Sequence, residues 1–138
     1  MTQTTVVTHH RHFHPDELMA ITLLSLYHFE GEHFELVRTR DEQTLNQHKQ
    51  DPSTFVIDVG FEYNPEMLNF DHHQNGMHEH WGDGTPYSSC GIVWKWLREN
   101  NKLHQHMNEE TMDVVEERVI KKIDAQDNGI EKWHEGTF

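Results

Sequence analysis

Two short apolar runs that each end in acidic or imidazole side chains constrain the fold of this chain more than any other feature. Residues 55–57 lead into Asp58, and residues 67–70 lead into the triplet Asp71, His72 and His73. Asp58 alone would equally suit an ordinary turn, but a triplet of ligand types is hard to explain by packing. Open α/β sheets place their sites at the carboxyl ends of strands, so we expect both runs to be strands that deliver ligands to one edge.

The residues before Asp58 predict alternating strands and helices. Val6 and Val7 suggest a minimal strand, and Pro15 suits the first position of a helix that runs to about Phe29 before Gly31. Residues 34–39 alternate as a strand, and residues 41–48 suggest a short polar helix. This order implies one α/β domain over residues 1–138, with a mostly parallel sheet of four or five strands and helices on both faces, as in Rossmann-like folds.

The second half predicts two further helices and one loop of open function. A helix is expected over residues 88–100, and an amphipathic helix over residues 108–125 with Gly129 as its C-terminal stop. The Gly-rich loop over residues 74–87 suits either a lid that faces the substrate or a solvated connection.

Composition narrows the class of partner. The 138 residues carry a formal charge of −13, which disfavours binding to long nucleic acids and anionic membranes. Fourteen histidines point to metal binding or pH sensing, and a single cysteine excludes a disulfide framework. Because no signal peptide, lipidation motif or long apolar run is present, a soluble cytoplasmic protein is expected.

Four separate segments carry side chains that could bind metal. More than four nitrogen and oxygen ligands, without a thiolate, exceed what one tetrahedral zinc needs and match a two-metal site for manganese, magnesium or cobalt. Two such ions can activate a water and neutralise phosphate oxygens. The candidates are His9, His14, Asp16, Asp58, His72 and an aspartate at position 124 or 127.

The order of these motifs resembles a known family. From Thr8 to Ile130 the chain carries T-H-x-x-x-F-H-x-D-E, I-D-V-G, F-D-H-H-Q, S-S-x-G and I-D-A-x-D-N-G-I. This order is similar to the melanocyte-proliferating-gene (MYG-type) branch of the DHH phosphoesterase superfamily. The superfamily also includes RecJ-type nucleases and family II inorganic pyrophosphatases.

The resemblance implies two divalent ions, manganese first and magnesium, cobalt or zinc otherwise. His9, His14, Asp16 and His72 would be ligands, and Asp58 would bridge the ions. His73 would face the phosphate, and Asp71 would orient the histidines without touching metal. The last ligand would be Asp127, whose D-N-G resembles the usual D-T-G, with Asp124 as the alternative. The spacing of four residues common in the superfamily makes His10 an alternative to His9.

The implied function is hydrolysis of a phosphodiester or phosphoanhydride by a metal-activated water, with catalysis assigned to His73, Asp58 and Asp71. Relatives are longer and carry a C-terminal region that grips the substrate, so this chain is expected to be the catalytic domain alone. A nucleotide or short oligonucleotide therefore suits it better than a long nucleic acid. A homodimer or partner chain would supply the missing surface.

Two other functions fit parts of the sequence. His14-Pro15-Asp16-Glu17 resembles the metal-binding block of zinc-dependent N-acetylglucosaminyl deacetylases, but this leaves the other three segments unexplained. A metallo-β-lactamase fits less well, because Glu17 stands where a histidine is needed. A metal- or nucleotide-binding module without turnover is the third function, and it would bind a nucleotide without releasing product.

Overall fold

A mostly parallel sheet forms the centre of the structure. The computed structural model describes residues 5–10, 12–71 and 80–129, and the strand order within these residues is β2-β1-β3-β5-β4. Only β4 runs antiparallel to its neighbour. The predicted α/β class and mostly parallel sheet are therefore confirmed. The strands are β1 (Thr5–Thr8), β2 (Glu35–Arg38), β3 (Thr54–Ile57), β4 (Tyr63–Asn64) and β5 (Asn69–Phe70).

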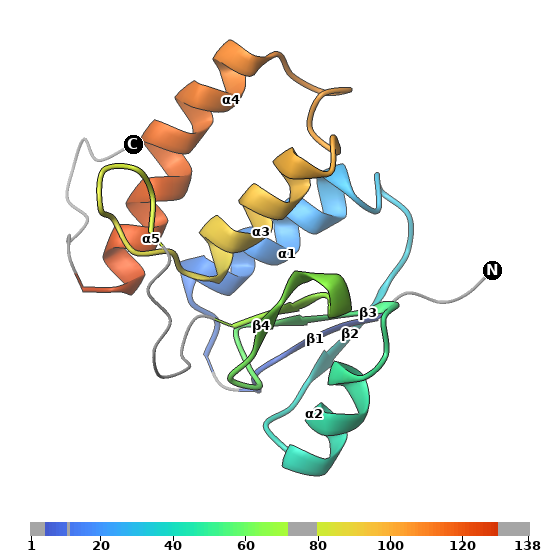
Figure 1. Ribbon diagram of the computed structural model, residues 1–138. Coiled ribbons are helices and arrows are strands. Elements are labelled where there is room, and N and C mark those ends of the chain that lie inside the picture. Colours follow the sequence, from blue (N-terminus) through green and yellow to red (C-terminus); the bar gives the residue numbers. More distant parts are fainter. Residues whose placement is uncertain (1–4, 11, 72–79, 130–138) are drawn as a thin grey trace.

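Helices cover both faces of this sheet, as expected. Helix α2 lies alone on one face, and the other helices of the described chain gather on the opposite face (Figure 1). None of these helices has both the length and the apolar character needed to cross a bilayer. The helices are α1 (Pro15–Tyr27), α2 (Glu42–Lys49), α3 (Ser89–Glu99), α4 (Glu109–Val115) and α5 (Lys121–Asp127), with a 3-10 turn at Pro65–Met67 and a π-helical segment at Glu116–Ile120.

Alternating side chains on the strands divide the core in two. Val6 and Phe55 face the larger cluster, which includes α1 and α3, whereas Val7 and Val56 face α2 and pack with Leu45. Successive residues of a strand point to opposite faces, so a strand buried on both sides is apolar throughout. This explains why residues 55–57 form an unbroken apolar run.

Two expected elements differ from the structure. The strand expected over residues 67–70 is only two residues long, because Leu68 has a left-handed backbone (φ 60°) and the 3-10 turn precedes it. The expected final helix is interrupted by the π-helical segment and continues to Asp127. Periodicity indicates whether a helix or strand forms but does not report a single left-handed residue.

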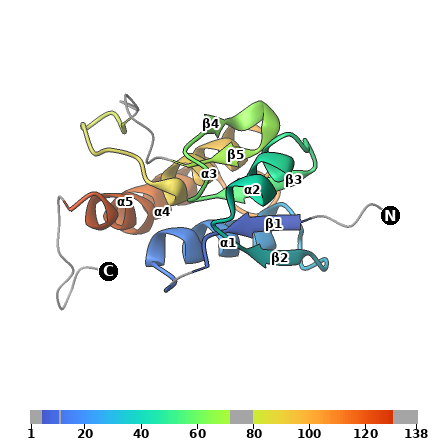
Figure 2. The same cartoon turned by 90° about the horizontal axis from the view of Figure 1, so that it is seen from below.

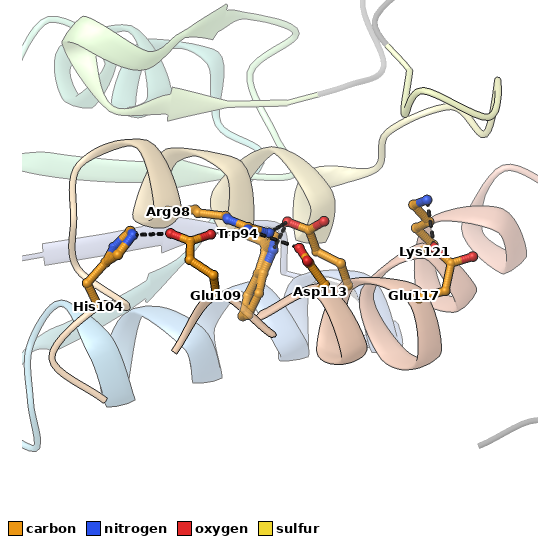
Figure 3. Close-up of polar contacts among 8 residues, drawn as sticks. Trp94, Arg98, His104, Glu109, Asp113, Glu117 and Lys121 are labelled. Carbon is orange, nitrogen blue, oxygen red and sulfur yellow. Dashed lines mark hydrogen bonds and ion pairs between the residues drawn. The ribbon is translucent and has the colours of Figure 1, made fainter. Parts of the chain in front are cut away.

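Polar contacts tie α4 and the π-helical segment to α3. The Arg98 guanidinium donates to Glu109 at 2.6 Å, Asp113 at 3.0 Å and Glu116 at 2.5 Å. Trp94 Nε1 also donates to Glu116, at 2.8 Å. Figure 3 shows Arg98 facing Glu109 and Asp113, with Lys121 and Glu117 forming a separate pair further along. One arginine thus joins α3 to the two helical segments that follow it in the chain.

Replacing Arg98 by methionine should lower the free energy of unfolding by about 1–2 kcal/mol, since Glu116 is largely buried and would lose a charged partner. Replacing Lys121 by methionine is the matched control. Its partners Glu117 and Asp83 are 67% and 48% exposed, so the cost should stay below about 1 kcal/mol. Urea denaturation of both variants measures the difference, and equal losses would contradict this role of Arg98.

Candidate metal centre

The carboxyl ends of three parallel strands meet at one edge of the sheet. His9 follows β1, Asp58 follows β3 and Asp71 follows β5. In Figure 2 the arrow of β1 points toward the end of the molecule where α5 lies, so the last helix reaches the same edge. The structure therefore brings the ends of the two predicted ligand strands together.

Four side chains converge at this edge. The ligand atoms of His9, His14, Glu17 and Asp58 all lie within 4.8 Å of one another. His9 Nε2 lies 2.9 Å from Glu17 Oε1 and 3.5 Å from Asp58 Oδ2, and His14 Nδ1 lies 3.7 Å from Glu17 Oε2. Two imidazoles and two carboxylates at these distances can hold a divalent cation.

The cluster is buried on one side and open on the other. His9, Glu17 and Asp58 are buried, whereas the side chain of His14 is 60% exposed. Burial raises the pKa of the Glu17 carboxyl above its ordinary value. Nδ1 of His9 and Oε2 of Glu17 are buried without a hydrogen bond from the described residues. Buried polar atoms normally have a hydrogen-bond partner. Atoms buried without one are therefore better explained as ligands of a cation than as parts of a packed core.

Sequence reasoning missed Glu17 as a member of the cluster. Glu17 is the third residue of α1, and its side chain accepts from the backbone N–H of His14 at 2.6 Å. The helix start therefore turns Glu17 back toward His14. A histidine followed three residues later by a glutamate at a helix N-terminus is the signal that could have found it.

A cavity of about 640 Å³ opens beside the cluster. Two predicted site residues outside the cluster, Asp71 and Asp127, line this cavity. The guanidinium-bearing Arg40 and the exposed aromatic ring of Phe61 also line it. Its lining is His9, His14, Pro15, Arg40, Asp58, Val59, Gly60, Phe61, Asp71, Gln126 and Asp127.

Asp16 and Asp124 lie in a buried network next to this cavity. The Ser88 hydroxyl lies 2.6 Å from Asp16 and 2.5 Å from Asp124. The Cys90 N–H donates to Asp16 at 2.6 Å, and the Trp81 Nε1–H donates to Asp124 at 2.6 Å. Burial raises the pKa of Asp124 to about 6, against hydrogen bonds that lower it. The Ser88 hydroxyl has one proton and can donate it to only one of the two carboxyls. In the other contact the carboxyl must donate, which favours a protonated carboxyl at one of the two aspartates.

The structure thus gives the predicted residues different surroundings. His9, His14 and Asp58 lie in the cluster, and Asp71 and Asp127 lie on the cavity wall. The Asp16 carboxyl is hydrogen-bonded to the Ser88 hydroxyl and the Cys90 N–H. Both carboxyl oxygens of Asp124 are also hydrogen-bonded. His10 lies instead in a neighbouring cavity with His12, Phe13 and Arg38. His72, His73 and residues 74–79 of the predicted lid lie outside the described residues.

Asp71 has a contact that suits a supporting role. Its Oδ2 accepts the backbone N–H of Phe61 at 2.7 Å, and its own N–H donates to the carbonyl of Glu62 at 3.0 Å. Asp71 therefore fixes the segment that follows β3.

Fold and cluster together define an α/β protein with a candidate metal centre at the carboxyl edge of its sheet.

Comparison with known proteins gives the family. The family model described as MYG1_exonuc, uncharacterised protein family UPF0160, matches residues 5–137. The MYG1 exonuclease of Mus musculus is 36% identical over 145 residues, covering 94% of this chain and 36% of the mouse protein. The MYG1 protein of Dictyostelium discoideum is 31% identical over 140 residues, covering 96% of this chain and 41% of that protein. No solved structure matches this chain.

The chain belongs to the MYG1 family. It spans 36% of the mouse relative and 41% of the Dictyostelium relative, well under half of either protein.

Proposed function

We propose that this chain is a metal-dependent phosphoesterase of the DHH type that hydrolyses a phosphodiester or phosphoanhydride in a nucleotide or short oligonucleotide. The observation that carries the proposal is the convergence of His9, His14, Glu17 and Asp58, three of which, His9, His14 and Asp58, also line a cavity. Relatives named MYG1 exonuclease support hydrolysis of a nucleic-acid phosphodiester.

The ligand set that we propose draws on the strand ends and on both flanking helices. His9, His14, Asp58 and Asp127 are ligands from the described residues, and His72 completes the set. The first turn of α1 adds one carboxylate: the family resemblance points to Asp16, and the distances favour Glu17. Asp58 would contribute its carboxylate to both ions. Manganese is the metal we expect first, because imidazoles with several carboxylates suit it.

When bound, the ions would activate a water and neutralise phosphate charge. The protein residues bind and orient the reacting groups. His73 donates a hydrogen bond to the phosphate oxygen on which charge develops, and Asp71 holds the segment after β3 in place. The apolar core behind His9 and Asp58 limits the access of bulk water from that side.

Metal content and turnover, followed in the same samples, test the proposal. Protein purified without chelator should hold about two equivalents of a manganese-type metal and release product from a panel of dinucleotides and nucleotides. His9→Ala should lose metal and turnover together, because its imidazole lies at the centre of the cluster. His10→Ala is the matched control and should keep both, since His10 is exposed in another cavity.

Other outcomes separate the alternatives. A single tightly held zinc without phosphoester hydrolysis would favour deacetylase chemistry, because four ligands suffice for one tetrahedral zinc. Nucleotide binding without product release would favour a module without turnover. Loss of metal in Glu17→Gln but not in Asp16→Asn would assign the helix carboxylate to Glu17, and the opposite result would assign it to Asp16.

A further inference from the structure

Phe61 is an aromatic ring on the cavity wall that packing does not explain. It is 70% exposed, the highest value among the exposed large apolar side chains of the described chain. It lines the same cavity as His9 and Asp58. A cavity that combines an aromatic ring with a few convergent polar groups is the usual form of a small-molecule binding site.

The backbone holds this ring in a costly conformation. Phe61 has φ +54°, and Asp58 and Gly60 nearby have φ +57° and +92°. Left-handed backbone is unfavourable for a bulky L-residue and persists where the surroundings enforce it. Here the Asp71 carboxylate accepts the Phe61 N–H at 2.7 Å, and Lys49 Nζ donates to the Gly60 carbonyl at 3.1 Å. Glycine would suit position 61 better if only the turn mattered.

Arg40 lies on the other side of the cluster. It follows β2, which pairs with β1, and β1 in turn pairs with β3. Along the edge of the sheet the order is therefore Arg40, His9, and then Asp58 with Phe61. Arg40 is exposed and is the permanently charged cation among the described residues of the cavity. In a chain with a net charge of −13, a cation at this point favours an anionic ligand.

We infer that this cavity is a nucleotide subsite in which the Phe61 ring stacks on a nucleobase and the Arg40 guanidinium binds phosphate. The inference rests on the proposed function and assigns the base contact of that nucleotide to Phe61 and a phosphate contact to Arg40. Every base has a face that can stack, so Phe61 gives affinity without sequence preference. One base–aromatic stack changes affinity by about 5- to 150-fold.

Equilibrium binding tests the stack without relying on turnover. Calorimetry with manganese would compare adenosine 5′-monophosphate with ribose 5-phosphate, which lacks the base. The wild-type protein should bind the nucleotide at least 5-fold more tightly, and Phe61→Gly should remove most of that difference. Phe61→Trp should restore it, because the larger ring also stacks. Leu26→Ala, on the exposed face of α1, is the control and should bind both probes as wild type does.

Thermal unfolding separates binding from structure. Phe61→Gly relieves the left-handed strain and removes exposed apolar surface, so its melting temperature should equal or exceed that of wild type. A binding role is supported if affinity for the nucleotide falls while stability is kept. Equal affinities of the wild type for both probes, or equal losses of both in Phe61→Gly, would overturn the inference.

Two further arms identify the phosphate contact and the source of the nucleotide. Arg40→Gln should lower the affinity for both probes to a similar extent, because both carry phosphate. Unchanged affinity for both probes would overturn the role of Arg40. A tetranucleotide that binds more tightly than the mononucleotide would identify a strand end as the source. A base-dependent affinity without hydrolysis would contradict the proposed function and leave this inference standing, and hydrolysis without base dependence would do the reverse.

Discussion

Replacing Asp58 by asparagine should lower phosphoester hydrolysis on the order of 1,000-fold, because the amide cannot bridge two cations. Asparagine suits the position structurally. It tolerates the left-handed backbone at φ +57°, and its oxygen can still accept from Ser89, whose hydroxyl lies 3.1 Å from Asp58 Oδ1. The fold should therefore survive, and the loss should come from the metal site alone.

Metal content and thermal unfolding are the measurements that accompany the rate. In metal-free protein Asp58→Asn should melt no earlier than wild type, since it removes one of two neighbouring buried carboxylates, Glu17 being the other. Asp113→Asn, with its side chain 69% exposed on α4, is the matched control and should keep full activity. Full turnover in Asp58→Asn would refute the assignment of Asp58 as a bridging ligand.

The fold was predictable because each strand carries its own signal. Residues 55–57 are apolar throughout, since both faces of β3 are covered, and Asp41 begins α2 by accepting the Thr44 N–H at 3.0 Å. The two-residue strand β4 was not predicted. Tyr63–Asn64 is too short to show alternation, and its pairing with β5 depends on the left-handed turn at Leu68.

The placement of the candidate residues was predictable at the strand ends and less so on the helices. His9 and Asp58 follow apolar runs, so the topology of a parallel sheet alone brings them together. Asp16 and Glu17 are adjacent acidic residues in the first turn of α1. Their side chains point in different directions, so that Asp16 lies in the buried network with Ser88 and Glu17 lies in the cluster with His9. Sequence spacing does not report that direction.

Asp124 and Asp127 should respond to substitution in opposite ways. Asp124→Ala should lower the free energy of unfolding by about 4 kcal/mol, because it leaves the Trp81 indole N–H and the Gly91 N–H buried without an acceptor. In a domain of this size the melting temperature should fall on the order of 15 °C. Asp127→Ala should cost less than about 1 kcal/mol, since Asp127 is only half-buried on the cavity wall.

The pH dependence of the Asp124 variant gives a second test. Burial raises the pKa of Asp124 from 3.8 to about 6, so the folded state binds this proton more tightly than the unfolded state does. The stability that this proton adds is fully present below about 3.8 and is lost as the pH rises through 6. Urea denaturation should therefore find a larger cost of Asp124→Ala at pH 5 than at pH 8. A constant cost would contradict the raised pKa.

Metal content then decides which aspartate is the ligand. Asp127→Ala should lose about one equivalent of metal and on the order of 100-fold in hydrolysis while keeping its fold. Asp124→Ala, assayed well below its lowered melting temperature, should keep its metal, because the Asp124 carboxyl is engaged by Trp81, Ser88 and Gly91. The reverse result, metal lost with Asp124 at unchanged stability, would move the ligand one turn earlier and reassign Asp127 to the cavity wall alone.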